Sequence, residues 1–140
     1  MKPDDDYLLK LGLAHYWFQY VEWGVIYAVH YATGKDLSEL SGANPGEVSR
    51  DLTEAWNGDP ELAALAERYK AFVTERNHLA HSHPATDDRD GGSLQRLFRH
   101  DIKAKNRPAT VMWISSEWLD EFIATAQVLD RDMQAASAKK

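Results

Sequence analysis

The sequence predicts a mainly α-helical protein, and three observations support that fold class. The chain has 140 residues, 44% hydrophobic and 27% charged, a balance typical of a single globular domain over residues 1–140. Two long segments place apolar residues at helical spacing, one near the start and one in the middle of the chain. There is no cysteine, which excludes a disulfide framework, a thiolate nucleophile and a zinc site with sulfur ligands.

Residues 4–33 are expected to form the first long helix. Its acidic start suits the positive end of the helix dipole, and Gly34 is placed to end it. Apolar residues cover more than one side of this segment, so it is buried on several sides or docked on a partner. It also carries aromatic residues of the kind enriched at interfaces. These are Tyr7, Tyr16, Trp17, Tyr20, Trp23 and Tyr27. We therefore expect a homodimer.

The same segment argues against a membrane protein. Its uncharged parts, residues 11–21 and 23–34, are each too short to span a bilayer, and Glu22 between them makes a single span costly. The chain opens without a charged region, an apolar run and a small-residue cleavage site in succession. We expect a cytoplasmic protein that does not associate with membranes.

Residues 36–58, which contain several glycines, are expected to form short helical turns around a loop. A second long helix, antiparallel to the first, then begins with Asp59 as N-cap and Pro60 in the first turn. Apolar residues mark one face of it at spacings of three and four. They are Leu62, Leu65, Tyr69 and Phe72. The next position on that face is Arg76, and Pro84 is expected to end the helix.

The last third of the chain is expected to contain a loop, a hairpin and a closing helix. Residues 85–93, rich in aspartate and glycine, read as a loop. Residues 94–114 are a possible small β-hairpin, with strands at 94–100 and 110–114 and a basic turn between them. Ser115 or Ser116 then caps a final amphipathic helix.

Charge is distributed unevenly along the chain. The net charge is −6, which argues weakly against nucleic acid as a partner. From Lys70 to Thr110, however, eight Lys and Arg stand against five Asp and Glu, a net +3. Such a segment suggests an anionic ligand nearby, although a solvated surface would look the same. The residues of this segment that could contact an RNA backbone are Arg96, Arg99, Lys103, Lys105 and Arg107.

Residues 76–83 are the best candidates for chemistry, and three interpretations are open. The cationic side chains could simply complement the negative end of the helix dipole. His78 and His81, with His83 or His100, could hold a metal, although this ligand set is thin. The third interpretation is acid–base chemistry on a phosphodiester, because an imidazole such as that of His81 can move a proton at cellular pH and Arg76 can stabilise negative charge on phosphate.

The segment Arg76-Asn77-His78-Leu79-Ala80-His81 resembles the Arg-Asn-x-x-x-His signature of HEPN domains. These are small helical-bundle proteins found in toxin–antitoxin, abortive-infection and CRISPR-linked ribonucleases. The order of elements is also similar: two long helices, the second ending in the motif, then an irregular insert and a closing helix. The resemblance covers most of the chain at the level of pattern.

The resemblance implies a metal-independent endoribonuclease, acting as a toxin or in antiviral defence, with no cofactor. Arg76 and His81 would be the catalytic pair and Asn77 the residue that orients them, in an active site shared across a homodimer. The 2′-OH of the RNA would attack the adjacent phosphate and leave a 2′,3′-cyclic phosphate. Glu22, His78 and His83 are possible supporting residues, with Glu22 as a candidate partner for Arg76.

One residue departs from the family pattern. In the subgroup paired with a nucleotidyltransferase antitoxin, a tyrosine lies two positions after the histidine, where this chain has His83. That puts this mode of control in doubt, and with it the identity of any cognate antitoxin or other regulatory partner. The alternative function is a catalytically inactive HEPN-type module that binds RNA, a nucleotide or a protein.

Overall fold

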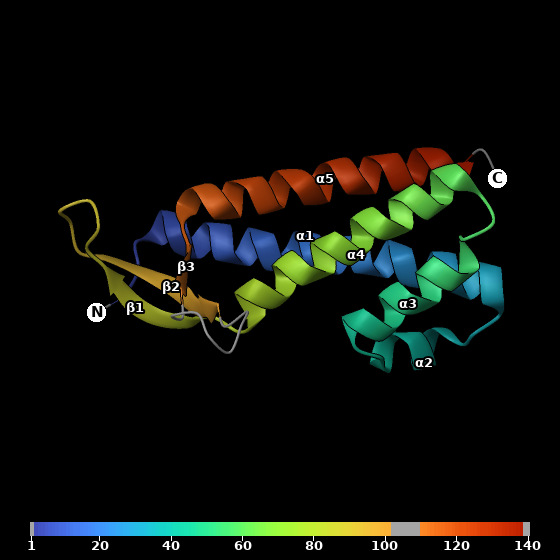
Figure 1. Ribbon diagram of the computed structural model, residues 1–140, viewed down its shortest axis with the longest axis horizontal. Coiled ribbons are helices and arrows are strands. Elements are labelled where there is room, and N and C mark those ends of the chain that lie inside the picture. Colours follow the sequence, from blue (N-terminus) through green and yellow to red (C-terminus); the bar gives the residue numbers. More distant parts are fainter. Residues whose placement is uncertain (1, 102–109, 139–140) are drawn as a thin grey trace.

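The structure describes residues 2–101 and 110–138, which form five helices and three strands in the computed structural model (Figure 1). The helices are α1 (Asp5–Thr33), α2 (Leu37–Gly42), α3 (Pro45–Ala55), α4 (Pro60–Ala80) and α5 (Ser116–Ala138). The strands are β1 (His83–Asp87), β2 (Leu94–Asp101) and β3 (Thr110–Ile114). The mainly helical fold class and the hairpin before the last helix are confirmed. Among the described residues, no helix combines the length and the hydropathy needed to cross a bilayer.

The predicted starts of α1 and α4 and the predicted end of α1 are confirmed. The end of α4 is a correction: the helix stops at Ala80, before the expected Pro84, because His83 and Pro84 already belong to β1. The Asp4 side chain accepts a hydrogen bond from the Tyr7 backbone N–H at 2.9 Å and caps α1. Gly34 ends that helix with φ at 77°, a conformation that glycine adopts without strain. Asp59 caps α4 by accepting from the Glu61 N–H at 2.9 Å. Aspartate oxygens suit these positions because the first backbone N–H groups of a helix have no partner within it.

The shorter elements also follow local capping chemistry. The predicted turns at 36–58 are the helices α2 and α3, and Asn44 caps α3 by accepting from the Glu47 N–H at 2.9 Å. Of the two serines proposed to start the last helix, Ser115 is the cap, since its hydroxyl accepts from the Trp118 N–H at 3.0 Å.

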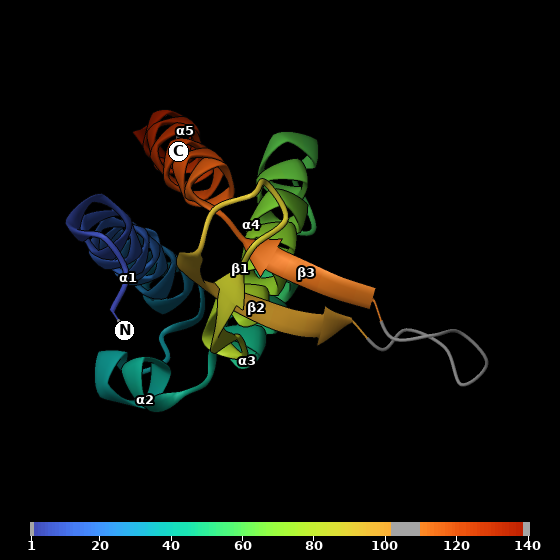
Figure 2. The same ribbon diagram turned by 90° about the vertical axis from the view of Figure 1, so that its left-hand side faces the viewer.

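The three long helices form a bundle with the sheet across one end (Figure 2). α1 and α5 run in the same direction, side by side, while α4 runs back antiparallel to both (Figure 1). Ion pairs on the surface follow this arrangement: Lys10 of α1 meets Asp120 early in α5 at 3.1 Å, and Arg68 early in α4 meets Asp132 late in α5 at 3.0 Å.

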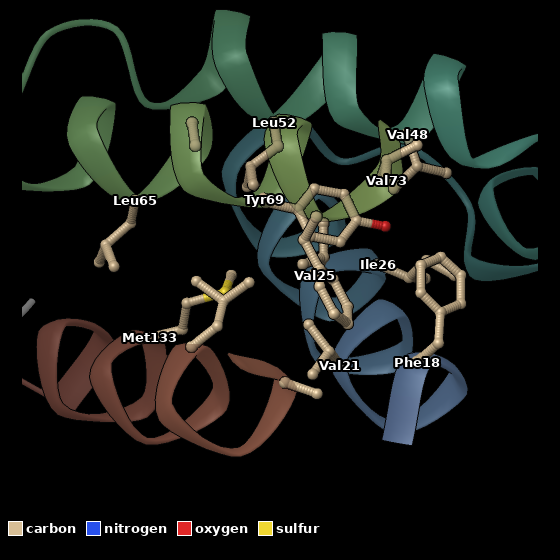
Figure 3. Packing of buried hydrophobic residues seen from close by; sticks show 14 of the residues in the cluster. Phe18, Val21, Val25, Ile26, Val48, Leu52, Leu65, Tyr69, Val73 and Met133 are labelled. Atoms are coloured by element: carbon tan, nitrogen blue, oxygen red, sulfur yellow. The ribbon is translucent and has the colours of Figure 1, made fainter. Parts of the chain in front are cut away.

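The core lies between α1, α3, α4 and α5 (Figure 3). Aromatic side chains link three of these helices. Phe72 of α4 packs on Phe18 of α1 and on Phe122 of α5, with ring centroids 5.5 and 4.7 Å apart. Large apolar rings of this kind supply most of the burial that stabilises a small bundle.

β1 corrects the first part of the loop predicted at residues 85–93: residues 85–87 belong to the strand, and residues 88–93 form the loop to β2. The helix α4 ends at Ala80, and β1 begins at His83 and pairs antiparallel with β2, with Ala85 opposite Arg96. The sheet order is β1-β2-β3, so β1 is an edge strand and tolerates Pro84. Its residues, with no large apolar side chain, give no periodic signal, because the pairing with β2 rather than burial holds the strand.

Tyr7 joins the start of α1 to the sheet. Its wholly buried hydroxyl donates to the Ile114 carbonyl oxygen at 2.6 Å and accepts from the Leu97 N–H at 3.0 Å. Leu97 and Ile114 face each other at one end of the β2–β3 pairing. The Arg96 guanidinium covers the Tyr7 ring at 4.2 Å and donates to Asp4 at 2.9 Å. The first turn of α1 therefore holds the sheet against the bundle.

Candidate functional site

The segment 76–81 occupies the last turn of α4, next to the sheet. Arg76 is half-buried, and its guanidinium lies over the Phe18 ring of α1 at 5.3 Å from the ring centroid. Its Nη1 also donates to the side-chain oxygen of Asn77 at 3.4 Å. The cation therefore continues the apolar face of α4, as its spacing from Phe72 predicts, and is accommodated there by an aromatic ring.

Two titratable groups lie within the electrostatic reach of Arg76. Burial raises the pKa of Glu22 on α1, and the positive charge of Arg76 opposes that rise. Burial also raises the pKa of Tyr69, which lies about two turns before Arg76 on the same side of α4. The charge of Glu22 adds to that rise and the charge of Arg76 opposes it. The Tyr69 hydroxyl is buried without a hydrogen-bond partner in the part of the chain that the structure describes.

Arg76 is therefore a cation that lies over an aromatic ring and within the electrostatic reach of an acid. Phe18 and Glu22 are four residues apart on α1 and so lie on one face of that helix. A guanidinium that is already oriented by its surroundings loses less freedom when it binds phosphate oxygens. The Phe18 ring and the Asn77 side chain are the contacts that orient the Arg76 guanidinium among the described residues.

His81 lies at the exposed end of the helix. It is the C-cap of α4, and its backbone N–H donates to the Asn77 carbonyl oxygen at 3.0 Å. Its side chain is exposed, and within the described residues it has no hydrogen bond or ion pair. On an ideal helix Arg76 and His81 point about 140° apart, and the described contacts bring Arg76 together with Asn77 but not with His81.

The neighbouring histidines have different surroundings. The Arg99 Nη1 on β2 lies 3.0 Å from the His78 Nδ1. Because a guanidinium only donates, the His78 Nδ1 acts as the acceptor and the ring carries its proton on Nε2. His83 is exposed at the start of β1, opposite Phe98. His100 is exposed and lies edge-on to the Phe98 ring.

Among residues 2–101 and 110–138, no group of three or more His, Asp or Glu side chains is arranged to hold a metal ion. The metal interpretation needs His78 beside His81, and the described structure assigns the His78 Nδ1 to Arg99 instead. A ligand set would therefore have to be completed from His83 or His100, which lie on strands.

Of the five basic residues proposed to contact RNA, two are described. Arg99 is half-buried and reaches the end of α4 through His78. Arg96 is a correction: its side chain is only 9% exposed and is held by Asp4 and the Tyr7 ring. It belongs to the framework that supports the sheet, because a cation paired in this way is not available to phosphate. The other three, Lys103, Lys105 and Arg107, lie outside the described residues.

Sequence reasoning missed Phe18 and Tyr69 as neighbours of the site. Both are apolar-face residues of long helices, so the helical pattern assigns them to the core, and both are indeed buried. A signal was present in the spacing, since Phe18 precedes Glu22 by four residues and Phe72 precedes Arg76 by four. Glu22 and Arg76 thus each continue an apolar face of their own helix. These two faces pack against each other through Phe18 and Phe72.

Comparisons with protein-family models, with curated proteins and with solved structures gave no match for this chain.

Proposed function

We propose that this protein is a metal-independent endoribonuclease whose catalytic residues are Arg76 and His81. The observation that carries the proposal is the position of Arg76: its guanidinium lies over Phe18 and within the electrostatic reach of Glu22, five residues before an exposed histidine. The resemblance of residues 76–81 to the HEPN signature supports the same assignment.

The reaction would use the RNA's own 2′-OH as nucleophile. The 2′ oxygen attacks the adjacent phosphorus, the bond from phosphorus to the 5′ oxygen breaks, and the products carry a 2′,3′-cyclic phosphate and a 5′-OH. The 2′-OH loses a proton in this step and the 5′ oxygen gains one. The His81 imidazole would accept the first or donate the second, with water exchanging the other, and an imidazole is suited to either role. Arg76 would stabilise the negative charge that builds on the phosphate oxygens.

Supporting residues have distinct roles in this proposal. Asn77 accepts from Arg76 through its side-chain oxygen and so helps to orient the guanidinium. Glu22 limits the positive charge of that site, and His78 with Arg99 adds a second cationic group where β2 meets α4. Arg99 is placed to hold a neighbouring phosphate of the same strand.

One observation favours the alternative function, an inactive module that binds RNA, a nucleotide or a protein. Arg76 turns inward toward Phe18, whereas His81 is exposed, and no described contact joins the two side chains. A phosphate that touches both residues would require Arg76 to lean out of its place on α4. If Arg76 keeps its inward position when RNA binds, the expected result is binding without cleavage.

The experiment that tests the proposal compares four purified chains on the same defined RNA. These are the wild type, Arg76→Ala, His81→Ala and His15→Ala. The last is a matched control, because it removes an exposed histidine of α1 that lies outside the signature and its supporting residues. We expect cleavage by the wild type and by His15→Ala, cyclic-phosphate ends on the fragments, no change with EDTA, and no cleavage by Arg76→Ala or His81→Ala.

The other outcomes are also informative. Cleavage retained in both Arg76→Ala and His81→Ala, with helical content unchanged, would remove these residues from the mechanism. An activity lost on chelation would favour the metal interpretation. RNA binding that weakens with salt, without cleavage by any variant, would establish the binding module in place of the enzyme.

A further inference from the structure

The outer face of α1 carries a continuous apolar stripe that no other part of the described chain covers. Its residues recur at spacings of three and four and are largely exposed. They are Leu9 (61%), Leu13 (39%), Tyr16 (60%), Tyr20 (46%), Trp23 (47%), the half-buried Tyr27 and Tyr31 (79%). From residue 11 to residue 34 the only Asp, Glu, Lys or Arg is Glu22, and it lies on the opposite side of the helix, near Arg76.

Such a face is unusual for a helix in contact with water. The chain is 27% charged, and the outward side of a bundle helix normally carries charged residues. The stripe instead resembles a helix interface, with aromatic rings already packed along it: Tyr16 on Tyr20 at 6.3 Å and Trp23 on Tyr27 at 5.1 Å between centroids. Tyrosine and tryptophan are enriched in such surfaces.

We propose that this stripe is the contact surface of a homodimer in which two α1 helices pack antiparallel across a two-fold axis near Tyr20. The stripe is self-complementary in this orientation, because its positions are arranged symmetrically about residue 20. Leu9 would meet Tyr31 of the second copy, Leu13 would meet Tyr27, and Tyr16 would meet Trp23 and Gly24. A two-fold contact requires this kind of reciprocal pairing.

The shape of the surface supports the same pairing. A groove next to the stripe is lined by Tyr16, Tyr20, Trp23 and Gly24 on α1 and by Asp130 and Gln134 on α5. Gly24 leaves open space where a side chain would stand, so the ring of Tyr16 from the second copy has a place to insert. Placing a large residue against a small one allows two helices to approach closely.

The area is sufficient for a second copy. From the exposed fractions of the six most exposed stripe residues, the apolar surface available is roughly 600 Å² per protomer, taking an aromatic side chain at about 200 Å². Two such faces together reach about 1,200 Å², the lower limit of specific protein interfaces. Contact by the flanking Gln19 and Gln134 would add to it.

The proposed dimer has a consequence for the site at the end of α4. Tyr16 and Tyr20 lie about 160° around α1 from Phe18, and Phe18 is the residue that Arg76 covers. The two Arg76 side chains would therefore lie on faces turned away from each other. This dimer differs from the shared cleft that the HEPN resemblance implies, and it rests on the fold alone rather than on the proposed activity.

The first test measures mass in solution. Light scattering should give the wild type twice the chain mass of 15.9 kDa, and Tyr20→Glu should be a monomer, because it places two carboxylates against each other on the axis. Val128→Glu is the matched control, since it adds the same charge at an exposed apolar residue of α5; it should remain a dimer. A monomeric wild type, including one that binds lipid vesicles instead, or a dimeric Tyr20→Glu would overturn the proposal.

The second test establishes the orientation and uses the absence of native cysteine. Under mild oxidation Tyr20→Cys should form a disulfide-linked dimer on its own. Leu9→Cys and Tyr31→Cys should each fail to do so alone but should crosslink when the two variants are mixed. Self-crosslinking of all three variants would indicate parallel helices and contradict the pairing. RNA cleavage by the monomeric Tyr20→Glu is measured separately, so failure of the ribonuclease proposal leaves this one intact.

Discussion

The change of Tyr7 to phenylalanine isolates the hydrogen bonds that hold the sheet to α1. The Tyr7 hydroxyl is wholly buried and bridges two backbone groups, the Leu97 N–H and the Ile114 carbonyl. Removing it leaves both groups without this partner while the ring, and hence the packing, is kept. An unsatisfied buried polar group costs about 1–3 kcal/mol.

The expected loss in the free energy of unfolding is the sum of the costs at the Ile114 carbonyl and the Leu97 N–H. Ile114 is wholly buried and Leu97 is half-buried, so water can partly compensate only at Leu97. We therefore expect Tyr7→Phe to lower the free energy of unfolding by about 2–4 kcal/mol, taking each group within the range for buried polar atoms. For a chain of this size that corresponds to a fall in Tm of roughly 7–14 °C.

The same substitution at Tyr69 provides a matched comparison. The Tyr69 hydroxyl is also buried but has no partner within the described residues, so its loss removes a desolvated group and breaks no hydrogen bond. Tyr69→Phe is therefore expected to leave stability unchanged or to raise it by about 1 kcal/mol.

Urea unfolding followed by circular dichroism measures both variants against the wild type. The reasoning is refuted if Tyr7→Phe lowers the free energy of unfolding by less than about 0.5 kcal/mol, which is the ordinary effect of a surface substitution. It is refuted equally if Tyr69→Phe is destabilised as strongly as Tyr7→Phe, because the two differ only in whether the hydroxyl has partners.

Three further predictions concern charge and packing. Burial raises the pKa of Glu22, so its carboxyl favours the fold below its ordinary pKa and loses that contribution as pH rises through the raised value; Glu22→Gln should increase the urea midpoint more at pH 7 than at pH 4. The Arg89 guanidinium lowers the pKa of Asp87 to about 2, so this ion pair is lost as pH falls from 3.8 toward 2; in Arg89→Gln, an NMR titration should show that pKa returning toward 3.8. Phe72→Ala should cost about 3–5 kcal/mol in urea unfolding, because the ring packs on two others in the core.

Much of the fold followed from local chemistry. The start and end of α1 and the start of α4 were predicted from the acidic first turn, Gly34 and Asp59, because capping depends on a few neighbouring residues and on backbone groups that every helix end exposes. The hairpin of β2 and β3 was predicted from two short segments on either side of a basic turn. The edge strand β1 was not, because its backbone is satisfied by β2 and its side chains carry no pattern of burial.

In the candidate site, too, the features that depend on nearby residues were predicted and those that depend on tertiary contacts were not. The sequence identified Arg76, Asn77 and His81 as a group and indicated that Arg76 extends an apolar face, since both inferences need only the spacing along one helix. It also proposed Arg96 as an RNA contact, whereas the fold uses that side chain to hold Asp4 and Tyr7. A basic residue's role depends on which acid or ring the fold brings to it.

The sequence by itself therefore determined the helical class, the capped starts of α1 and α4 and the position of the Arg76–His81 segment, because these depend on contacts between residues a few positions apart. Only the tertiary structure decided that Arg76 lies over Phe18, that His78 pairs with Arg99 and that the stripe from Leu9 to Tyr31 faces outward. These features join residues far apart in the chain, and their geometry depends on how α1, α4 and the sheet pack together.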